Sequence, residues 1–374
     1  MNKVSIVMLS YNTYELTKTC IESIRRFTPP GSYEIIVVDN GSDDASPAWL
    51  KRQQDIKLIL NEENHGFPAG CNQGMMLADE GNDILLLNSD VIVTPRWLVN
   101  LKQALYSAPD VGAVGCVTNK CSNRQQVDVA YNDFNELIAL ADKINHSNPK
   151  LWEKRVFLVG FCLLIKHAAF QQVGFLDERF TPGNCEDDDY CLRLIKAGYQ
   201  LLLCRDTFIH HYGSASFRKK FSGGEEHQKA VKKDYNALLA RNTKLLSDKW
   251  QLGEHYRGWS SLISEIAELE NPDTEKRILV IGCDMYYSLA VLCSAYPKAR
   301  IMGVSEHWAE AAVSGRVFDV AYCPDAEQDV FVLMSGYYDY ILLADRYKQY
   351  KDFDGYVDKL SKYLAPGGSI HIND

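Results

Sequence analysis

The first 60 residues alternate between short apolar runs and segments with helical spacing. Apolar runs cover residues 4–9, 34–38 and 56–60, and the segments between them, residues 13–27 and 46–53, have helical spacing. A β-α-β-α-β order with short connections predicts a parallel sheet with helices on both faces. Ligands of such sheets bind beyond the carboxyl ends of the strands, so the residues that follow each strand are the candidates for function.

A fourth apolar run, residues 83–93, is interrupted by Asn88, Ser89 and Asp90. Its four consecutive aliphatic residues predict a strand that is buried on both faces. A buried helix segment is the alternative, but Asn-Ser-Asp is poor helix material. A carboxylate at the end of a buried strand is costly unless something pairs with it, so Asp90 predicts a metal, a cation or a helix N-terminus beside it.

Composition narrows the class of protein. A length of 374 residues predicts two domains, and a net charge of −9 disfavours a protein that binds nucleic acid or anionic lipid without specificity. The 11 cysteines match no common zinc pattern, and reduced thiols in the cytoplasm are the simplest account.

The longest apolar run, residues 156–165, is too short to span a bilayer, and residues 1–4 lead directly into a strand. We therefore expect a cytoplasmic protein without a signal peptide or transmembrane segment, and peripheral contact with the inner face of the cell membrane stays open.

Two candidate ligand-binding segments follow the early strands. Asp39 begins an Asp-Asn-Gly-Ser sequence, which is typical of a turn, and the turn is the favoured interpretation. A carboxylate that contacts a base or ribose is the alternative. Residues 61–74 hold three glycines before a helix predicted at residues 75–79. Such a loop lets backbone approach a ligand closely, and a helix N-terminus favours an anion. The segment matches neither a Walker A loop nor a dinucleotide-binding fingerprint.

Later segments have simpler predictions. We expect a helix at residues 95–107, a strand at 111–117, an irregular acceptor-side loop at 119–150, a strand at 156–165 and a closing helix at 225–249. The basic residues 214–224 could form a lid over phosphates or, equally, a solvated loop. Glu186, Asp187, Asp188 and Asp189 fall in the first turn of another predicted helix, where acids commonly complement the helix dipole.

In order and spacing, these elements resemble the family-2 glycosyltransferases of the GT-A fold. The matching residues are 4–12, 37–42, Asn64-His65-Gly66-Phe67 with Asn72, Asn88-Ser89-Asp90, Gly160-Phe161-Cys162, 175–180, Glu186-Asp187-Asp188-Asp189-Tyr190 with Arg193, and His210-His211-Tyr212-Gly213. The resemblance covers about the first 245 residues and is nearest the rhamnosyltransferase-like and polysaccharide-assembly members. It implies an α/β fold with a mixed, mostly parallel sheet flanked by helices.

The resemblance also implies roles for individual residues. Nucleotide-binding positions would be Ser10, Tyr11, Asn12, Asp39, Asn64, Gly66, Phe67, Asn72, Asn88 and Ser89, with Asp39 on the base. Asp90 and His210 would hold a divalent cation, Mn²⁺ or Mg²⁺, on the diphosphate, with His211 as the runner-up. Asn88 replaces the first acid of the family's D-x-D motif, which puts metal affinity or metal choice in doubt.

For the acid cluster, the resemblance implies that Asp187 is the general base and that Glu186 orients the acceptor. Asp188 is the alternative base, and Gly160 is a further candidate site residue. Asp189 and Arg193 are expected to support the helix start and to form a structural ion pair, respectively.

The C-terminal part, residues 276–374, follows a predicted helical linker at residues 251–275 and a first domain at residues 1–250. Its order of strands resembles the class I S-adenosylmethionine-dependent methyltransferases, with Glu306 at the ribose-binding place. Where that family has G-x-G-x-G, this chain has Gly282-Cys283-Asp284-Met285-Tyr286, whose bulky side chains would obstruct the cofactor. The sequence stops before the last strands of such a fold, so we expect a degenerate and truncated Rossmann-like module.

These inferences predict a metal-dependent inverting glycosyltransferase. It would move a sugar from a nucleoside-diphosphate sugar, such as a UDP-sugar, to a hydroxyl of a glycan, glycolipid or glycoprotein by single displacement. A non-catalytic scaffold that binds sugar nucleotides and a bifunctional glycosyltransferase-methyltransferase are the alternatives. A nucleotidyltransferase would need a basic glycine-rich loop near the N-terminus, which residues 10–15 lack.

Overall fold

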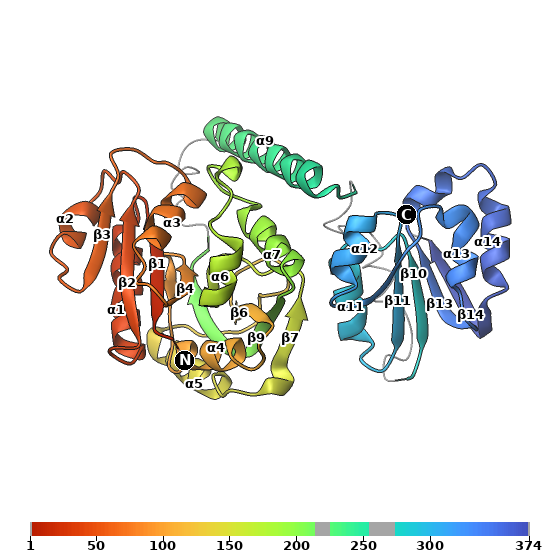
Figure 1. Ribbon diagram of the computed structural model, residues 1–374, viewed down its shortest axis with the longest axis horizontal. Coiled ribbons are helices and arrows are strands. Elements are labelled where there is room, and N and C mark those ends of the chain that lie inside the picture. The colour runs from red at the N-terminus through yellow and green to blue at the C-terminus, as the bar shows by residue number, and fades with distance from the viewer. Residues whose placement is uncertain (1, 214–224, 254–273, 373–374) are drawn as a thin grey trace. The chain divides into compact units, whose positions relative to one another are not determined.

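The computed structural model describes residues 2–213, 225–253 and 274–372. The chain divides into two compact units, Met1–Leu245 and Leu246–Asp374, and each unit has its own sheet (Figure 1). The lid or loop expected at residues 214–224 and most of the predicted linker at residues 251–275 lie outside the described residues.

The first unit is built on one mixed sheet. Its strands lie in the order β3 (Ile56–Leu60), β2 (Tyr33–Asp39), β1 (Val4–Ser10), β4 (Asp83–Leu87), β8 (Cys162–Ile165), β6 (Val111–Thr118), β9 (Gln200–His211) and β5 (Val91–Ile92), and β7 (Trp152–Arg155) also pairs with β9. Strands β3, β2, β1 and β4 are parallel, as are β6 and β9, whereas β8 runs antiparallel to both β4 and β6. The predicted mixed sheet flanked by helices is confirmed.

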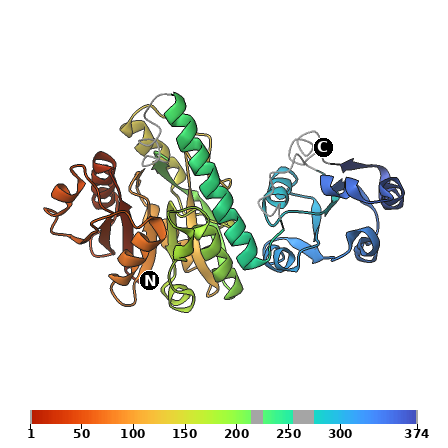
Figure 2. The ribbon, with the colours of Figure 1, turned by 90° about the horizontal axis from the view of Figure 1, so that it is seen from above.

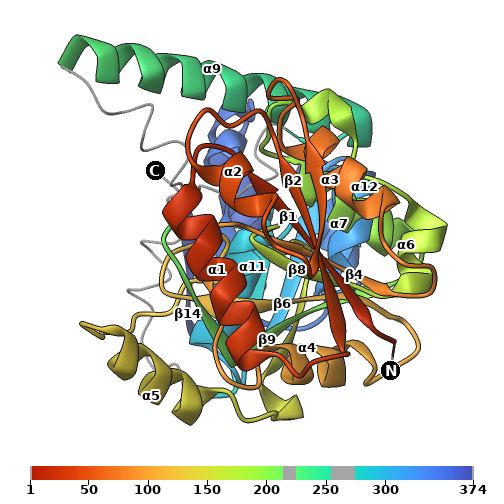
Figure 3. The ribbon, with the colours of Figure 1, turned by 90° about the vertical axis from the view of Figure 1, so that its left-hand side faces the viewer.

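Helices cover both faces of this sheet. The helices up to residue 250 are α1 (Tyr14–Phe27), α2 (Ser46–Leu50), α3 (Phe67–Met76), α4 (Trp97–Leu105), α5 (Phe134–Ile144), α6 (His167–Val173), α7 (Glu186–Lys196) and the long α9 (Glu225–Trp250), with short 3-10 turns at Pro149–Leu151 and Glu178–Phe180. Figure 3 shows α1 and α4 beside the sheet, and Figure 2 shows α9 as one long green helix.

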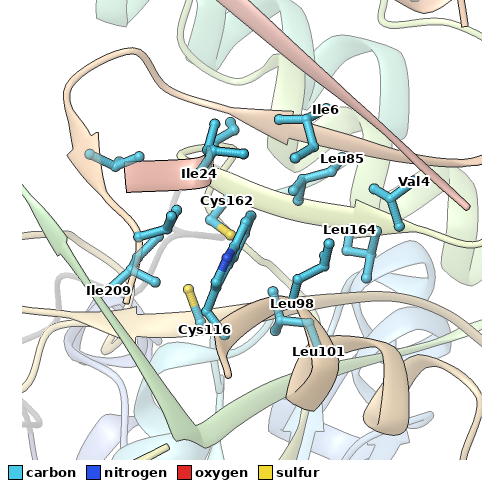
Figure 4. Packing of buried hydrophobic residues seen from close by; sticks show 14 of the residues in the cluster. Val4, Ile6, Ile24, Leu85, Leu98, Leu101, Cys116, Cys162, Leu164 and Ile209 are labelled. Atoms are coloured by element: carbon cyan, nitrogen blue, oxygen red, sulfur yellow. The ribbon is translucent and has the colours of Figure 1, made fainter. Parts of the chain in front are cut away.

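The core of the first unit follows from strand alternation. Val4 and Ile6 of β1 point into a cluster with α1 and α4, whereas Val7 and Leu9 point to the opposite face, where α3 packs. Figure 4 shows Ile24, Leu98 and Leu101 of the helices against Val4, Ile6, Leu85, Leu164, Cys116, Cys162 and Ile209. Burying a large aliphatic side chain of this kind contributes about 1.5–3 kcal/mol, so the cluster holds α1 and α4 against this face of the sheet.

Helix α3 corrects the predicted glycine-rich loop. The helix begins at Phe67, not at residue 75, with Pro68 in its first turn. A Cβ atom at Gly70 would lie 2.3 Å from Leu9 Cδ1, and one at Gly74 would lie 2.5 Å from Val7 Cγ1. These two glycines therefore let α3 approach β1 closely. The close approach that was predicted for a ligand is made here by this chain's own sheet.

Two further predictions in the first unit were wrong. Residues 119–150 are not a continuous irregular loop, because Asp133 caps α5 by accepting from the next helical amides and α5 buries Leu137 and Ala141. Of the strand predicted at residues 156–165, only Cys162–Ile165 is a strand.

Side chains replace strand pairing in the segment before β8. The backbone amides of Leu158, Val159 and Gly160 donate to Cys191 Sγ, Gln125 Oε1 and Asp187 Oδ2, respectively. These bonds satisfy buried amides without a neighbouring strand. The run of apolar residues thus reflects burial and not regular structure.

The second unit is a parallel sheet with helices. Its strands lie in the order β12 (Asp319–Tyr322), β11 (Arg300–Ser305), β10 (Arg277–Ile281), β13 (Tyr338–Leu343) and β14 (Leu364–Ile372). Helices α11 (Tyr287–Ala295), α12 (Trp308–Ser314), α13 (Ala326–Leu333) and α14 (Phe353–Ser361) and a 3-10 turn at Asp345–Gln349 connect them. The predicted Rossmann-like α/β sheet of this region is confirmed. Across the part of the chain that the structure describes, no helix has both the length and the apolar character needed to cross a bilayer.

Candidate active site

A buried carboxylate lies at the carboxyl edge of the first sheet. Asp39 ends β2 beside Ser10 of β1, and only 1% of Asp39 is exposed. Its Oδ1 accepts a hydrogen bond from the Ser42 amide at 2.9 Å, whereas Oδ2 has no hydrogen-bond partner among the described residues. Burial raises the pKa of Asp39. One oxygen of Asp39 therefore braces the turn, whereas the other lacks a donor among the described residues. Contact with a base or ribose stays a prediction.

Asn12 joins the turns that follow β1 and β2. Its backbone amide donates to Ser42 Oγ at 2.9 Å, and its side-chain oxygen accepts from the Asp43 amide at 2.9 Å. The left-handed backbone of Asn12, with a φ of 54°, allows this geometry. Tyr11 is half-buried beside it, and Ser10 Oγ lies 3.1 Å from Thr17 Oγ1. Asn12 therefore connects the turn after β1 to the turn after β2, in which Asp39 lies.

Asn64 and Gly66 shape the loop before α3. Asn64 Oδ1 accepts from Asn40 Nδ2 and from the Gly66 amide, each at 2.8 Å. Gly66 has a φ of +84°, and a Cβ there would lie 2.9 Å from Pro182 Cα. The amide of Phe67 donates to the Pro182 carbonyl at 2.9 Å. The close approach predicted for Gly66 is thus made by residues 181–182 of the chain itself.

Asn72 is committed inside the protein. Its Nδ2 donates to the Leu176 carbonyl at 3.0 Å and to Glu178 Oε1 at 2.9 Å, and its Oδ1 accepts from the Leu176 amide at 2.9 Å. The side chain is buried in the middle of α3. The structure therefore places Asn72 as a bridge between α3 and residues 176–178, and not among the residues at the sheet edge.

Asp90 meets His211 where β4 leads into β5. Asp90 Oδ1 lies 3.2 Å from His211 Nε2, and Asn88 Nδ2 lies 3.5 Å from the same nitrogen. Asp90, Ser89 and His211 are all buried. The Ser89 hydroxyl faces Thr13, 3.4 Å away.

The ring of His211 is held in one orientation. Its Nδ1 lies 2.8 Å from the Lys120 carbonyl oxygen, and its ring stacks on Phe161 with a centroid distance of 5.0 Å. A carbonyl can only accept, so Nδ1 carries a proton and donates it. Nε2 then faces Asp90 at 3.2 Å, so the two groups can share a proton or hold a cation between them. Histidine ligands of metals are commonly held by such a second hydrogen bond.

His210 turns to a different set of neighbours. Its Nδ1 lies 2.5 Å from the Tyr131 hydroxyl, and its ring meets Tyr212 edge-on at 4.4 Å. Burial first, and His211 second, lower the pKa of His210 to about 4. Successive side chains of a strand point to opposite faces. The structure thus brings His211 to Asp90 and not the predicted His210.

The acid cluster forms the first turn of α7. Asp187 Oδ2 accepts from the Gly160 amide at 3.0 Å, and its Oδ1 accepts from the Asp188 amide at 2.9 Å. Asp189 is fully buried and pairs with Arg193 at 2.9 Å, which is the predicted structural ion pair. Glu186, the first helical residue, is also buried.

Residues 160 and 161 join the two parts of the site. The Gly160 amide donates to Asp187, a Cβ at Gly160 would lie 3.4 Å from Asp187 Cβ, and the Phe161 carbonyl accepts from the Asn88 amide at 2.9 Å. The Phe161 ring also stacks on His211. Sequence patterns gave Phe161 and Lys120 no role, because their partners lie far away along the chain.

The residues beside Asp90 form an incomplete metal-ligand set. Within residues 2–213, 225–253 and 274–372, no three His, Cys, Asp or Glu side chains converge on one point. Asp90 and His211 supply one carboxylate and one imidazole, and the Asn88 amide lies next to them. Two protein ligands leave positions for diphosphate oxygens and water, which suits Mg²⁺ or Mn²⁺ on a phosphorylated substrate. The donor set therefore fits such a cation.

The corresponding edge of the second sheet is filled by its own side chains. Glu306 follows β11 and accepts from the Tyr347 hydroxyl at 2.9 Å and the Tyr350 hydroxyl at 3.3 Å, with Arg346 Nε 3.5 Å away. A Cβ at Gly282 would lie 2.5 Å from Tyr347 Cε2. The space between the glycine turn and Glu306 thus holds Tyr347, and these residues do not fit a bound S-adenosylmethionine.

Comparison with known proteins bears on the first unit. Residues 5–174 match the family model described as Glycosyl transferase family 2. The low-salt glycan biosynthesis hexosyltransferase Agl10 of Haloferax volcanii is 24% identical over 55% of this chain and 66% of its own length. The N-acetylglucosaminyl-diphospho-decaprenol L-rhamnosyltransferase of Mycobacterium tuberculosis is 26% identical over 53% of this chain and 72% of its own. Over residues 5–174, the first unit is therefore similar to glycosyltransferase domains of family 2.

A solved structure with a related arrangement is the mannosyltransferase PcManGT of Pyrobaculum calidifontis in complex with GDP-Man and Mn²⁺. It has a TM-score of 0.44 and 18% identity over 66% of this chain and 72% of its own. The chain spans only 18% to 66% of the length of three of the curated relatives that it matches. These comparisons do not support the methyltransferase resemblance of the C-terminal unit.

Proposed function

We propose that the first unit is a metal-dependent inverting glycosyltransferase. It transfers a sugar from a nucleoside-diphosphate sugar to a hydroxyl of a glycan, glycolipid or glycoprotein acceptor in the cytoplasm. The observation that carries this proposal is the pair of Asp90 and His211, 3.2 Å apart at the carboxyl edge of the sheet. It explains the buried carboxylate and fits the family match at residues 5–174.

The donor would lie along this edge. Asp39 Oδ2, buried and without a partner among the described residues, accepts an N–H of the base. Asp90 and His211 would hold a divalent cation, which would supply the positive charge that a diphosphate leaving group requires. This positive charge matters because the protein already carries a net charge of −9.

Asp187 acts as the general base in this mechanism. It removes a proton from the acceptor hydroxyl, the hydroxyl oxygen attacks the anomeric carbon, and the bond from that carbon to the nucleoside diphosphate breaks. One displacement inverts the anomeric configuration. The Gly160 amide donates to Asp187 Oδ2 at 3.0 Å and fixes the orientation of this carboxylate in the first turn of α7.

The test replaces Asp187 by Asn and uses Asp188→Asn as the matched control. Removal of the base from a helix start should lower transfer or donor hydrolysis about 100-fold or more, with nucleoside diphosphate affinity unchanged. Asp188→Asn should keep activity within a few-fold. Full activity in Asp187→Asn would refute the assignment, and a larger loss in Asp188→Asn would move it to that neighbour.

A further inference from the structure

A side chain from α9 holds the loop that leads into α7. Asn242 is fully buried, and its Nδ2 lies 2.8 Å from the Phe180 carbonyl oxygen and 2.9 Å from those of Gly183 and Asn184. One amide group therefore donates to a cluster of three backbone acceptors from a loop about 60 residues earlier in the chain.

The preceding residue fixes the orientation of this amide. Arg241 donates to Asn242 Oδ1 from Nε at 2.9 Å and from Nη2 at 2.8 Å. A guanidinium can only donate, so the oxygen of Asn242 faces Arg241 and the NH₂ group faces the loop. Arg241 Nη2 also donates to the Thr181 carbonyl. Helix α9 thus contacts four carbonyl groups of residues 180–184.

The held loop contains backbone conformations that residues other than glycine rarely adopt. Asn184 has a φ of 76° and Cys185 a φ of 73°. Each such conformation persists only where the surrounding structure enforces it. Cys185 is the N-cap residue of α7 and provides no side-chain cap. Glu186 and Asp187 follow directly, so their positions depend on this strained turn.

We infer that Asn242 is a positioning residue for the general base. Its bonds to Gly183 and Asn184 enforce the left-handed turn and thereby set where Asp187 lies relative to the Gly160 amide. The inference rests on the proposed function, because it concerns the same base. It adds α9, which no catalytic motif covers, to the parts of the chain on which the reaction depends.

The test replaces Asn242 by Asp in the full-length protein. Aspartate keeps the size of the side chain but places acceptors where three carbonyl oxygens need donors. Asn145→Asp is the matched control. Asn145 is also fully buried, and its Nδ2 donates to Thr94 Oγ1, the Pro95 carbonyl and the Phe208 carbonyl, away from α7.

Two measurements compare the variants with the wild type. Hydrogen exchange should become faster at residues 183–188 in Asn242→Asp and stay unchanged there in Asn145→Asp. Steady-state hydrolysis of the sugar nucleotide that the wild type cleaves best with Mn²⁺ should show a kcat about 10- to 100-fold lower in Asn242→Asp, as expected for a displaced catalytic group. The KM for that donor should change less than kcat, because among the described residues Asn242 Nδ2 donates to carbonyl groups of the loop that leads into α7.

Wild-type exchange at residues 183–188 in Asn242→Asp would overturn the inference, as would a kcat no lower than that of Asn145→Asp. If Asn242→Asp does not fold, Arg241→Met keeps the amide but removes its anchor and gives the same test. If the wild type cleaves no sugar nucleotide, the proposed function fails, whereas the exchange result still decides whether Asn242 holds the loop.

Discussion

Two adjacent histidines carry different chemistry because they lie on opposite faces of one strand. His211 is fixed by the Lys120 carbonyl and the Phe161 ring, with Nε2 toward Asp90. His210 is buried against the Tyr131 hydroxyl. The proposed assignment of a metal to His211 therefore follows from side-chain orientation, which a His-His sequence does not reveal.

This difference predicts the behaviour of two single variants. His211→Ala should weaken binding of Mn²⁺ in the presence of a nucleoside diphosphate by at least about tenfold, because it removes one of two protein ligands. His210→Ala should leave that affinity within about twofold. Electron paramagnetic resonance of free Mn²⁺ measures both. Equal affinities in the two variants would contradict the assignment, and weaker binding in His210→Ala would reverse it.

Among the helices, α3 shows how the amino-acid composition of a segment can prevent its prediction as a helix. Gly66, Pro68, Gly70 and Gly74 read as a loop, because glycine and proline are poor in helix interiors. The contacts that override this preference come from Val7 and Leu9 on β1 and from residues 181–182. Tertiary packing of this kind cannot be read from local propensity.

The same contacts predict the effect of a methyl group. In an exposed helix, Gly→Ala stabilises by about 1 kcal/mol. Gly74→Ala should instead lower the free energy of unfolding by about 1–3 kcal/mol, since its Cβ would overlap the Val7 side chain. Urea denaturation measures the change, and Met76→Ala, at a largely exposed position of the same helix, is the control. A stabilised Gly74→Ala variant would contradict this prediction and would show that the Val7 side chain of β1 can move to accommodate the methyl group.

Most strands could be predicted from the sequence, whereas the contacts of the site could not. Residues 4–9, 34–38, 56–60 and 84–87 were recognisable because each is a short apolar run between turn residues. Helix α5 was missed because only Leu137 and Ala141 form its buried side. Phe161, Lys120 and Asn242 contact residues 50, 91 and 59 positions away along the chain, respectively, and no local pattern reports such pairs.

At the scale of the whole molecule, the two units differ in what their sheet edges leave open. In the first unit, a buried Asp39 oxygen lacks a donor among the described residues. In the second unit, Glu306 is already satisfied by Tyr347 and Tyr350. The sequence argument against a methyltransferase rested on residues 283–286, but the structure gives a different reason, which is that Tyr347 fills the space beside Gly282.

The filled edge predicts that the full-length chain does not bind S-adenosylmethionine. Isothermal titration at a ligand concentration of about 1 mM, which detects binding free energies of about −4 kcal/mol, should show no saturable heat. One-to-one binding would contradict this reading. Glu306→Gln would then show whether the ligand lies at this edge. A lower affinity of this variant for S-adenosylmethionine would place the ligand beside Glu306, where it would have to displace Tyr347.

The proposed donor chemistry is tested most directly by incubating the full-length protein with a panel of nucleoside-diphosphate sugars and measuring release of the nucleoside diphosphate. The account predicts that one donor is cleaved with Mn²⁺ or Mg²⁺, that a chelator stops the reaction, and that Asp90→Asn weakens it by at least about tenfold. Release of no nucleoside diphosphate from any donor, or release that persists without a divalent cation, would contradict it.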